Sequence, residues 1–165
     1  MIETLVSTLI FTVIAMGIFL VMTVAQRSWF SGDAAVEVRQ QLIIALITMN
    51  RELSETTSGK TDLTADTPKA SITFSIPHDN NGDGRIIDDD GKIEWSEPIT
   101  YYRDASNNLL RTFGGAVSIM AHDISSLQFI NTENKLIQVD IKAEKIDGMG
   151  KLTRDVERAI IKMRN

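Results

Sequence analysis

The sequence predicts an α+β fold, in which one long N-terminal helix (residues 1–55) packs on a head of antiparallel β-strands (residues 56–165). Three observations lead to this prediction. An apolar run from Leu5 to Ala25 continues without a proline into a one-sided helical pattern. Short strand-like runs follow residue 70, each bounded by turn residues. Once the helix is set aside, about 110 residues remain, which is enough for one independent core.

The run from Leu5 to Ala25 contains no charged residue. At about 1.5 Å per helical residue, it can cross a hydrocarbon core about 30 Å thick. A cleaved signal peptide explains it less well, because the basic n-region is missing, the run is too long and no small-residue cleavage site follows it. We therefore expect a transmembrane anchor at about residues 5–25. Trp29 and Phe30 are expected either at the membrane interface or against a neighbouring subunit.

The helix is expected to continue to Glu55, since only Gly32 interrupts the chain beyond Arg27. Between residues 34 and 53, apolar residues recur at steps of three and four, which places them on one helical face. These residues are Ala35, Val38, Leu42, Ala45, Leu46, Met49 and Leu53. The polar residues expected to lie largely elsewhere are Arg39, Gln40, Asn50, Arg51 and Glu52. The second half of the helix should therefore pack against the head.

Residues 56–69 are rich in Thr, Ser, Asp and Gly, which predicts a loop from the helix to the sheet. The strand-like runs that follow are residues 71–76, 92–95, 99–103, 109–113, 117–121, 126–130 and 136–146. In the last run, apolar and polar residues alternate, as in a strand with one solvated face. Turns are expected at residues 104–108 and 131–134. Together these elements predict a meandering antiparallel sheet.

Composition excludes several classes of function. The net charge is −5 and the 17 basic residues form no patch, so no nucleic-acid partner is predicted. The chain has no cysteine, so it has neither disulfides nor a thiolate nucleophile. His78 and His122 are far apart and are expected to be ordinary loop or exposed residues. Because no catalytic constellation and no phosphate-binding loop is recognisable, we expect no enzymatic activity.

Residues 79–90 match the pattern of an EF-hand type calcium loop. Oxygen-bearing side chains occupy positions one, three and five, a glycine that permits a sharp bend occupies position six, and an aspartate replaces glutamate at position twelve. The predicted ligands are Asp79, Asn81, Asp83, the backbone carbonyl of Arg85, and Asp90. Ile87 at position nine departs from the pattern.

Five carboxylates in twelve residues would repel one another in a compact empty loop, which favours a bound cation. Calcium is the expected cofactor, with a stabilising role in which Ile86 and Ile87 tie the loop to the core. The alternative is a solvated turn, because Asp, Asn and Gly dominate turns in any case.

The stretch Ile2-Glu3-Thr4-Leu5-Val6, followed by Ile10-Phe11, resembles the start of a mature type IV pilin or type II secretion pseudopilin. In that family the N-terminus reads Phe-Thr-Leu-Ile-Glu-Thr-Leu-Val after its leader is cleaved. The carboxylate is then the fifth residue, whereas Glu3 is the third here. We interpret the sequence as starting inside the motif, with Met1 at the family's third position.

Looser similarities continue downstream and resemble larger minor pilins and J-type minor pseudopilins. They lie at residues 101–103, 108–111, 124–129 and 164–165. The segment from Leu152 to Met163 fits either helical or strand spacing by its own residues, and the resemblance implies a strand.

The resemblance also implies a function. It implies a single-pass subunit of the cytoplasmic (inner) membrane, with its head outside the cytoplasm, that assembles with other pilin or pseudopilin subunits into a filament or its tip. In that family, the residue matching Glu3 pairs with the N-terminal amine of an adjacent subunit. The alternative is a single-pass membrane protein with a calcium-dependent extracytoplasmic binding or sensing domain.

Overall fold

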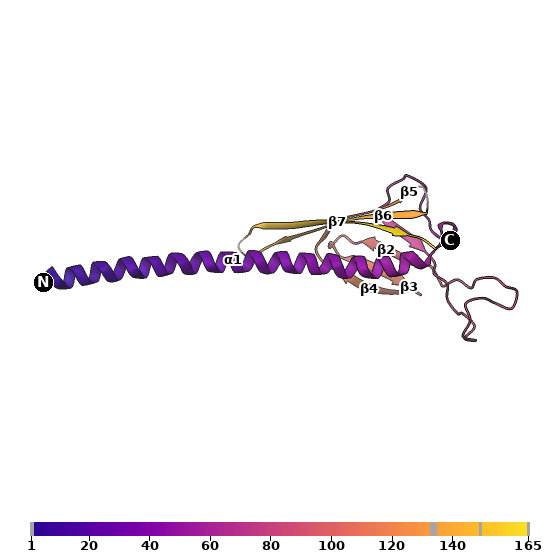
Figure 1. Cartoon of the computed structure of the whole chain (residues 1–165), viewed down its shortest axis with the longest axis horizontal. Coiled ribbons are helices and arrows are strands. Elements are labelled where there is room, and N and C mark those ends of the chain that lie inside the picture. The colour runs from indigo at the N-terminus through magenta and orange to yellow at the C-terminus, as the bar shows by residue number, and fades with distance from the viewer. Residues whose placement is uncertain (1, 133–134, 149, 165) are drawn as a thin grey trace.

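A computed structural model describes residues 2–132, 135–148 and 150–164 of the chain. One helix, α1 (Ile2–Glu55), runs through the whole molecule: its N-terminal part stands free as a stalk and its C-terminal part enters the head (Figure 1). A short 3-10 helix, η1 (Ser58–Lys60), follows it, and the rest of the regular structure is β. The α+β fold with a long N-terminal helix is confirmed, and the helix ends at the predicted residue.

The strands form two antiparallel meanders. The first contains, in spatial order, β1 (Ser71–Phe74), β2 (Ile99–Arg103), β3 (Leu109–Phe113) and β4 (Ala116–Ala121). The second contains β5 (Ile124–Thr132), β6 (Leu136–Ile146) and β7 (Leu152–Lys162). Helix α1 packs against β7, β6 and β4, so the two sheets flank it on different sides (Figure 1).

The division into two sheets differs from the single meander expected from the sequence. Between β4 and β5 the chain makes a tight turn through Asp123, at a φ of 61°, and these two strands do not pair with each other. The segment before β1 joins the two sheets instead. Its residue Thr61 bridges to Phe74 of β1, and Lys69 bridges to Phe129 of β5. These contacts cover part of each inner strand edge, which an open sheet must protect.

Two further expectations have different outcomes. The run at residues 92–95 is not a regular strand: its members form isolated bridges, Ile93 with Ile87 and Trp95 with Pro77, inside one loop excursion. The reason is that these residues pair with the other limb of their own loop and not with either sheet. The ambiguous C-terminal segment is a strand, β7, which pairs along its full length with β6.

The first predicted turn, at residues 104–108, lies between the paired strands β2 and β3, whereas the first two residues of the second, 131 and 132, belong to β5 and pair with β6. At the first, the Asp104 N–H donates to the Asn108 carbonyl at 3.0 Å, and Asn107 takes a left-handed φ of 63°. Asparagine tolerates this conformation better than most residues. The second turn connects β5 to β6, but residues 133 and 134 lie outside the described part of the chain.

The core forms around one face of the second half of α1. Its buried helix residues recur every three to four positions and are Ala34, Val38, Leu42, Ala45, Met49 and Leu53. Ala34 is buried in place of the predicted Ala35, which is exposed, and Leu46 is only half-buried. The largest fully buried side chains from the strands include Phe74, Tyr101 and Phe129. Burial of this apolar face explains why the helix is fixed to the head.

Candidate functional sites

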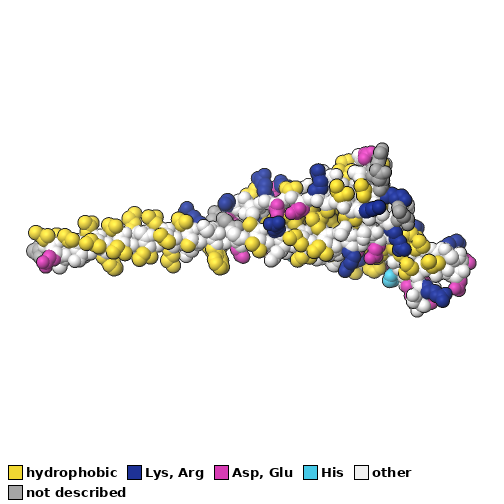
Figure 2. Space-filling view, viewed as in Figure 1, with side chains coloured by type: hydrophobic (Ala, Val, Ile, Leu, Met, Phe, Trp, Pro, Cys, Tyr) yellow, Lys and Arg dark blue, Asp and Glu magenta, His cyan; other side chains and the backbone are white. Residues whose placement is uncertain are grey.

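The first candidate site is the stalk, α1 from Ile2 to Phe30. Every side chain in it is exposed except the half-exposed Thr23, although most are apolar. Phe11 is 73% and Phe19 is 69% exposed, and hydrophobic side chains cover the visible face of the stalk (Figure 2). Its most apolar window has a mean hydropathy of 2.6. By length and composition, this helix can cross a membrane.

Threonine hydroxyls inside the stalk satisfy their hydrogen bonds within the helix. Thr8 and Thr12 donate to carbonyls four residues earlier, at 2.9 and 2.7 Å, and Thr23 donates to the Phe19 carbonyl at 2.8 Å. A polar group in an apolar environment costs free energy unless it is paired. These hydroxyls are therefore compatible with burial of the stalk in lipid or between helices.

Glu3 is the acidic residue in the first turn of α1 and is exposed. A carboxylate at a helix N-terminus is favoured by the positive end of the helix dipole. In Figure 2 an acidic side chain is visible at the tip of the stalk, and charged side chains become frequent again only near the head. The arrangement leaves one anionic group at the end of a long apolar rod.

The stalk meets the head at Phe30. The hairpin between β6 and β7 reaches this ring, since a Cβ placed on Gly148 would lie 3.6 Å from a Phe30 ring carbon. An ion pair of 2.5 Å between Lys145 Nζ and Glu37 Oε1 follows one to two helical turns later. Trp29, the preceding residue, is 77% exposed. The head therefore begins to cover α1 between Phe30 and Ala34.

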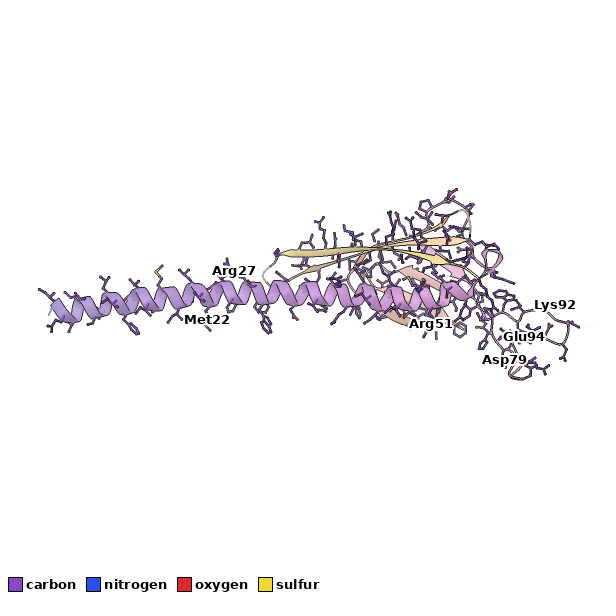
Figure 3. The ribbon with its side chains drawn as sticks, viewed as in Figure 1. Met22, Arg27, Arg51, Asp79, Lys92 and Glu94 are labelled. Carbon is purple, nitrogen blue, oxygen red and sulfur yellow. The ribbon has the colours of Figure 1, made fainter. Side chains whose placement is uncertain are left out.

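The second candidate site is the acidic loop, residues 79–90, at the end of the head farthest from the stalk (Figure 3). Asp79 accepts backbone hydrogen bonds from Gly82 and Gly84, at 2.6 and 2.7 Å. Asn81 Oδ1 accepts from the Asp83 N–H at 2.9 Å. Gly84 has a φ of +81°, so the sharp bend predicted at position six is present.

Asp83 continues the pattern, because its Oδ1 accepts from the Arg85 N–H at 2.8 Å. The backbone N–H of Gly84 is the main cause that holds the pKa of Asp79 below its usual range. The side chains at positions one, three and five are thus oriented by the loop's own backbone. They are carboxylate and amide groups, the ligand types that Ca²⁺ takes in proteins.

The structure pairs Asp90 with a lysine and places a different carboxylate beside the first residues of the loop. Asp90 Oδ2 lies 3.9 Å from Lys92 Nζ. Glu94 instead accepts from the Asn80 N–H at 2.7 Å and from Asn81 Nδ2 at 3.1 Å. Figure 3 shows Asp79 and Glu94 close together on this lobe.

Sequence reasoning missed Glu94 because it counted twelve positions along one loop. The signal that could have found it is the apolar pair Ile93 and Trp95 that flanks it. Trp95 bridges to Pro77, which brings Glu94 opposite the first residues of the loop.

The loop is attached to the head through its backbone and not through its apolar side chains. Ile86 and Ile87 are 39% and 51% exposed, so the expectation that they tie the loop to the core is wrong. The loop is held instead by its backbone, for example by a hydrogen bond of 3.0 Å from the His78 N–H to the Glu94 carbonyl. Within the described residues, no group of three or more His, Cys, Asp or Glu side chains is arranged to hold a metal ion. The predicted site also uses the Asn81 amide and a backbone carbonyl, which are not among those four side-chain types.

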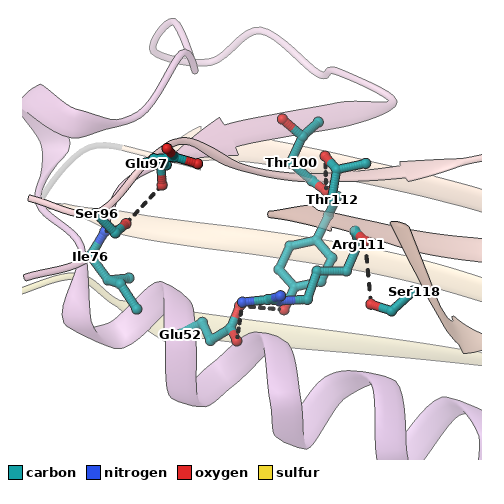
Figure 4. A network of polar contacts seen from close by, with 9 residues as sticks. Glu52, Ile76, Ser96, Glu97, Thr100, Arg111, Thr112 and Ser118 are labelled. Atoms are coloured by element: carbon teal, nitrogen blue, oxygen red, sulfur yellow. Dashed lines mark hydrogen bonds and ion pairs between the residues drawn. The ribbon is translucent and has the colours of Figure 1, made fainter. Parts of the chain in front are cut away.

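A buried polar network ties the helix to the first sheet (Figure 4). Glu52 is 7% exposed, which corrects the expectation that it lies away from the packed face. The Tyr101 hydroxyl donates to Glu52 Oε2 at 2.7 Å, and Arg111 donates to both carboxylate oxygens at 3.1 Å. Burial, reinforced by the neighbouring carboxylate, raises the pKa of Tyr101. The three side chains satisfy one another, which indicates a structural role.

The two histidines do not come together. His122 is exposed, and its Nδ1 lies 2.8 Å from Asn108 Oδ1. His78 is exposed and directly precedes the acidic loop.

Comparison of the chain with models of protein families, with curated proteins and with solved structures finds no match.

Proposed function

We propose that this chain is a minor pilin or minor pseudopilin subunit. In this proposal α1 anchors the subunit in the cytoplasmic membrane with the head outside the cytoplasm, and the same helix later packs among the helices of other such subunits in a filament or its tip. One observation carries the proposal: α1 is continuous, exposed and apolar from Ile2 to Phe30, and it supplies the core of the head from Ala34 to Leu53.

The continuity of α1 supports assembly as the purpose of the stalk. A stalk that is apolar on all sides needs cover, either from lipid or from other apolar helices. Because the helix runs without a linker into the head core, a force that withdraws the head from the membrane also withdraws the stalk. Cover by neighbouring helices can then replace cover by lipid. Glu3 at the tip would meet a cationic group of the next subunit in that low-dielectric bundle, where ion pairs are strong.

We further propose that Ca²⁺ binds the acidic loop and stabilises the head. The ligands are Asp79, Asn81, Asp83, the backbone carbonyl of Arg85 and Glu94, which takes the place that the twelve-residue pattern gives to Asp90. The hydrogen bonds that already orient the first three side chains support this assignment. A cation that binds only the folded loop stabilises it in proportion to the logarithm of its concentration.

The alternative is a single-pass membrane protein whose head senses or binds a partner through calcium and never polymerises. The loop lies at the end of the head opposite the stalk, where a partner can reach it, and this position favours the alternative (Figure 3). This alternative function gives no reason for Glu3, the carboxylate at the tip of the stalk.

The test of assembly is co-purification from membranes. The full chain carries a tag after residue 165, is cross-linked in its native host, and is purified in detergent. We expect other single-pass subunits with a similar apolar N-terminal helix to be recovered, and we expect Glu3→Gln to reduce their recovery at unchanged membrane content. Arg27→Gln is the control at the other end of the stalk. If the chain is recovered without any such subunit, and neither variant differs from the wild type in what it recovers, the alternative is favoured.

A separate titration tests the metal. Thermal melting of the full chain in detergent is followed with calcium and with a chelator. We expect calcium to raise the melting temperature, and Asp83→Ala and Glu94→Ala each to remove that rise. Asp89→Ala, an exposed neighbour in the same loop, is the matched control. A rise that survives both ligand variants would contradict the assigned site.

A further inference from the structure

A cleft of about 370 Å³ lies where β5 passes the ends of β1 and β2, at the seam between the two sheets. Its walls are Pro68, Lys69 and Ala70 from the segment before β1, Arg103 from the end of β2, and residues 125–128 of β5. Clefts of about 300–1,000 Å³ are typical of ligand sites. Neither the stalk nor the acidic loop contributes to it.

The edge of β5 in this cleft is paired at both ends but not between them. Phe129 exchanges two backbone hydrogen bonds with Lys69, at 2.8 and 2.9 Å. At the other end, the Ile124 N–H donates to the Asn107 carbonyl at 2.7 Å. Leu127 directs its N–H and C=O to the same edge as Phe129, because alternate residues of a strand share an edge. The strand pairings and loop hydrogen bonds of the described residues give Leu127 no partner there.

Leu127 lines the cleft, so a ligand in the cleft can supply the backbone hydrogen-bond partners that the described part of the protein does not. An extended peptide satisfies such an edge by adding a short strand, with its own N–H and C=O groups as partners. From Ile124 to Phe129 the strand spans about 15 Å, which leaves room for about three residues of an added peptide.

The charged side chains of the cleft indicate which peptide side chain it would bind. Arg103 donates from Nη1 to Asn107 Oδ1 at 2.6 Å, and it takes part in none of the ion pairs among the described residues. Lys69 is paired with Asp62 at 3.2 Å. Arg103 lies close enough to Asp104 to attract that carboxylate electrostatically, but the two form no ion pair in the described part of the chain. Arg103 is therefore the cation of this cleft that can receive a further carboxylate, which its planar guanidinium binds in a bidentate manner.

We propose that this cleft binds a short extended segment of a partner protein. The segment adds as a strand to the edge of β5, pairs with the backbone of Leu127, and places an acidic side chain on Arg103. The cleft uses no residue of α1 and no residue of the acidic loop, so the proposal does not rest on the proposed function.

The test uses the full chain in detergent and a panel of capped pentapeptides. Each peptide has glutamate at its centre between β-branched residues, as in Thr-Val-Glu-Val-Thr, and has a counterpart with glutamine. Binding is followed by NMR, together with hydrogen exchange of the Leu127 amide. We expect saturable binding of the glutamate peptides that slows this exchange at least fivefold. Arg103→Gln and the glutamine counterpart should each weaken binding at least fivefold, whereas Arg39→Gln, at an exposed site on α1, should leave it unchanged.

Several outcomes would overturn the proposal. These are an absence of saturable binding across the panel, equal binding of glutamate and glutamine peptides, or protection that spares Leu127. Acetate serves as the small-anion probe. If acetate perturbs the Arg103 signals as strongly as the peptides do, and no peptide protects Leu127, the cleft is an anion site without strand addition. The circular dichroism spectrum of Arg103→Gln should match the wild type, because the side chain is exposed.

Discussion

The two halves of α1 differ in the pattern of their apolar residues and have opposite surroundings. From Ile2 to Phe30 the helix is apolar on all sides and touches almost nothing in the head. From Ala34 to Leu53 it is apolar mainly on one face, and that face is fully buried. The comparison shows that helical periodicity, more than hydrophobicity, identifies which part of a long helix belongs to a head. The half without periodicity needs an environment that the chain itself does not supply.

The largest expected effect comes from the buried half. Leu42→Ala removes a fully buried side chain and should destabilise the head by about 2–5 kcal/mol. Its neighbour Ile43 is 44% exposed, so Ile43→Ala should cost no more than about 0.5 kcal/mol. Thermal melting of the full chain in detergent measures both. Equal losses from the two variants would contradict the assigned burial face.

An aspartate substituted in each half of α1 tests whether the exposed apolar side chains of that half are covered by lipid. Ile14 and Ile47 are similarly exposed in the isolated subunit, at 55% and 65%. Ile14→Asp should nevertheless disfavour membrane insertion by about 3 kcal/mol, the cost of an aspartate near the middle of a spanning helix. Ile47→Asp should leave insertion unchanged. Membrane fractionation of the full chain measures the difference, and equal partitioning of both variants with the wild type would argue against a spanning stalk.

The buried network gives the next effect in size. Glu52→Ala leaves the Tyr101 hydroxyl and the Arg111 guanidinium without their shared acceptor, which should cost about 1–3 kcal/mol. Glu55→Ala, at an exposed site one turn later, should be nearly neutral. Denaturant unfolding of the full chain in detergent distinguishes them. A neutral Glu52→Ala would show that the network does not fasten the helix to the first sheet.

The smallest expected effect is a pH dependence confined to the head. The guanidinium of Arg158 is the main cause that holds the pKa of Asp140 below its usual range. Because the pKa is lower in the folded chain than in the unfolded chain, the stabilisation is present above about pH 5 and is lost as the pH falls through the folded value.

The size of that contribution is small, since the Arg158 side chain is 64% exposed and solvent screens the pair to a few tenths of a kcal/mol. Melting curves between pH 6 and pH 3 should therefore fall slightly more steeply for the wild type than for Asp140→Asn. Parallel curves would contradict the assignment.

The sequence was sufficient to predict what depends on local pattern. The absence of helix breakers predicted that α1 is continuous, and the loop-like composition of residues 56–69 predicted its end at Glu55. The alternation along residues 136–146 predicted β6. The glycine at position six of the acidic loop predicted the bend at Gly84.

Features that depend on distant partners were missed. Glu52 is buried only because Arg111, far away in the sequence, neutralises it. The split into two sheets lies at the turn between β4 and β5, and the two sheets are joined instead by distant bridges such as Lys69 to Phe129, which no local pattern reveals. Glu94 reaches the acidic loop because a return limb of the chain folds back beside it.

The central claim is that the stalk is covered in its working environment, whereas the face of the second half of α1 that points away from the head stays accessible. The chain has no cysteine, so single substitutions Ile14→Cys and Ile47→Cys can be labelled with a membrane-impermeant maleimide in intact membranes. We predict that Ile14→Cys reacts only after detergent is added, whereas Ile47→Cys reacts once the extracytoplasmic side is accessible. Equal labelling of both positions in the absence of detergent would contradict the account.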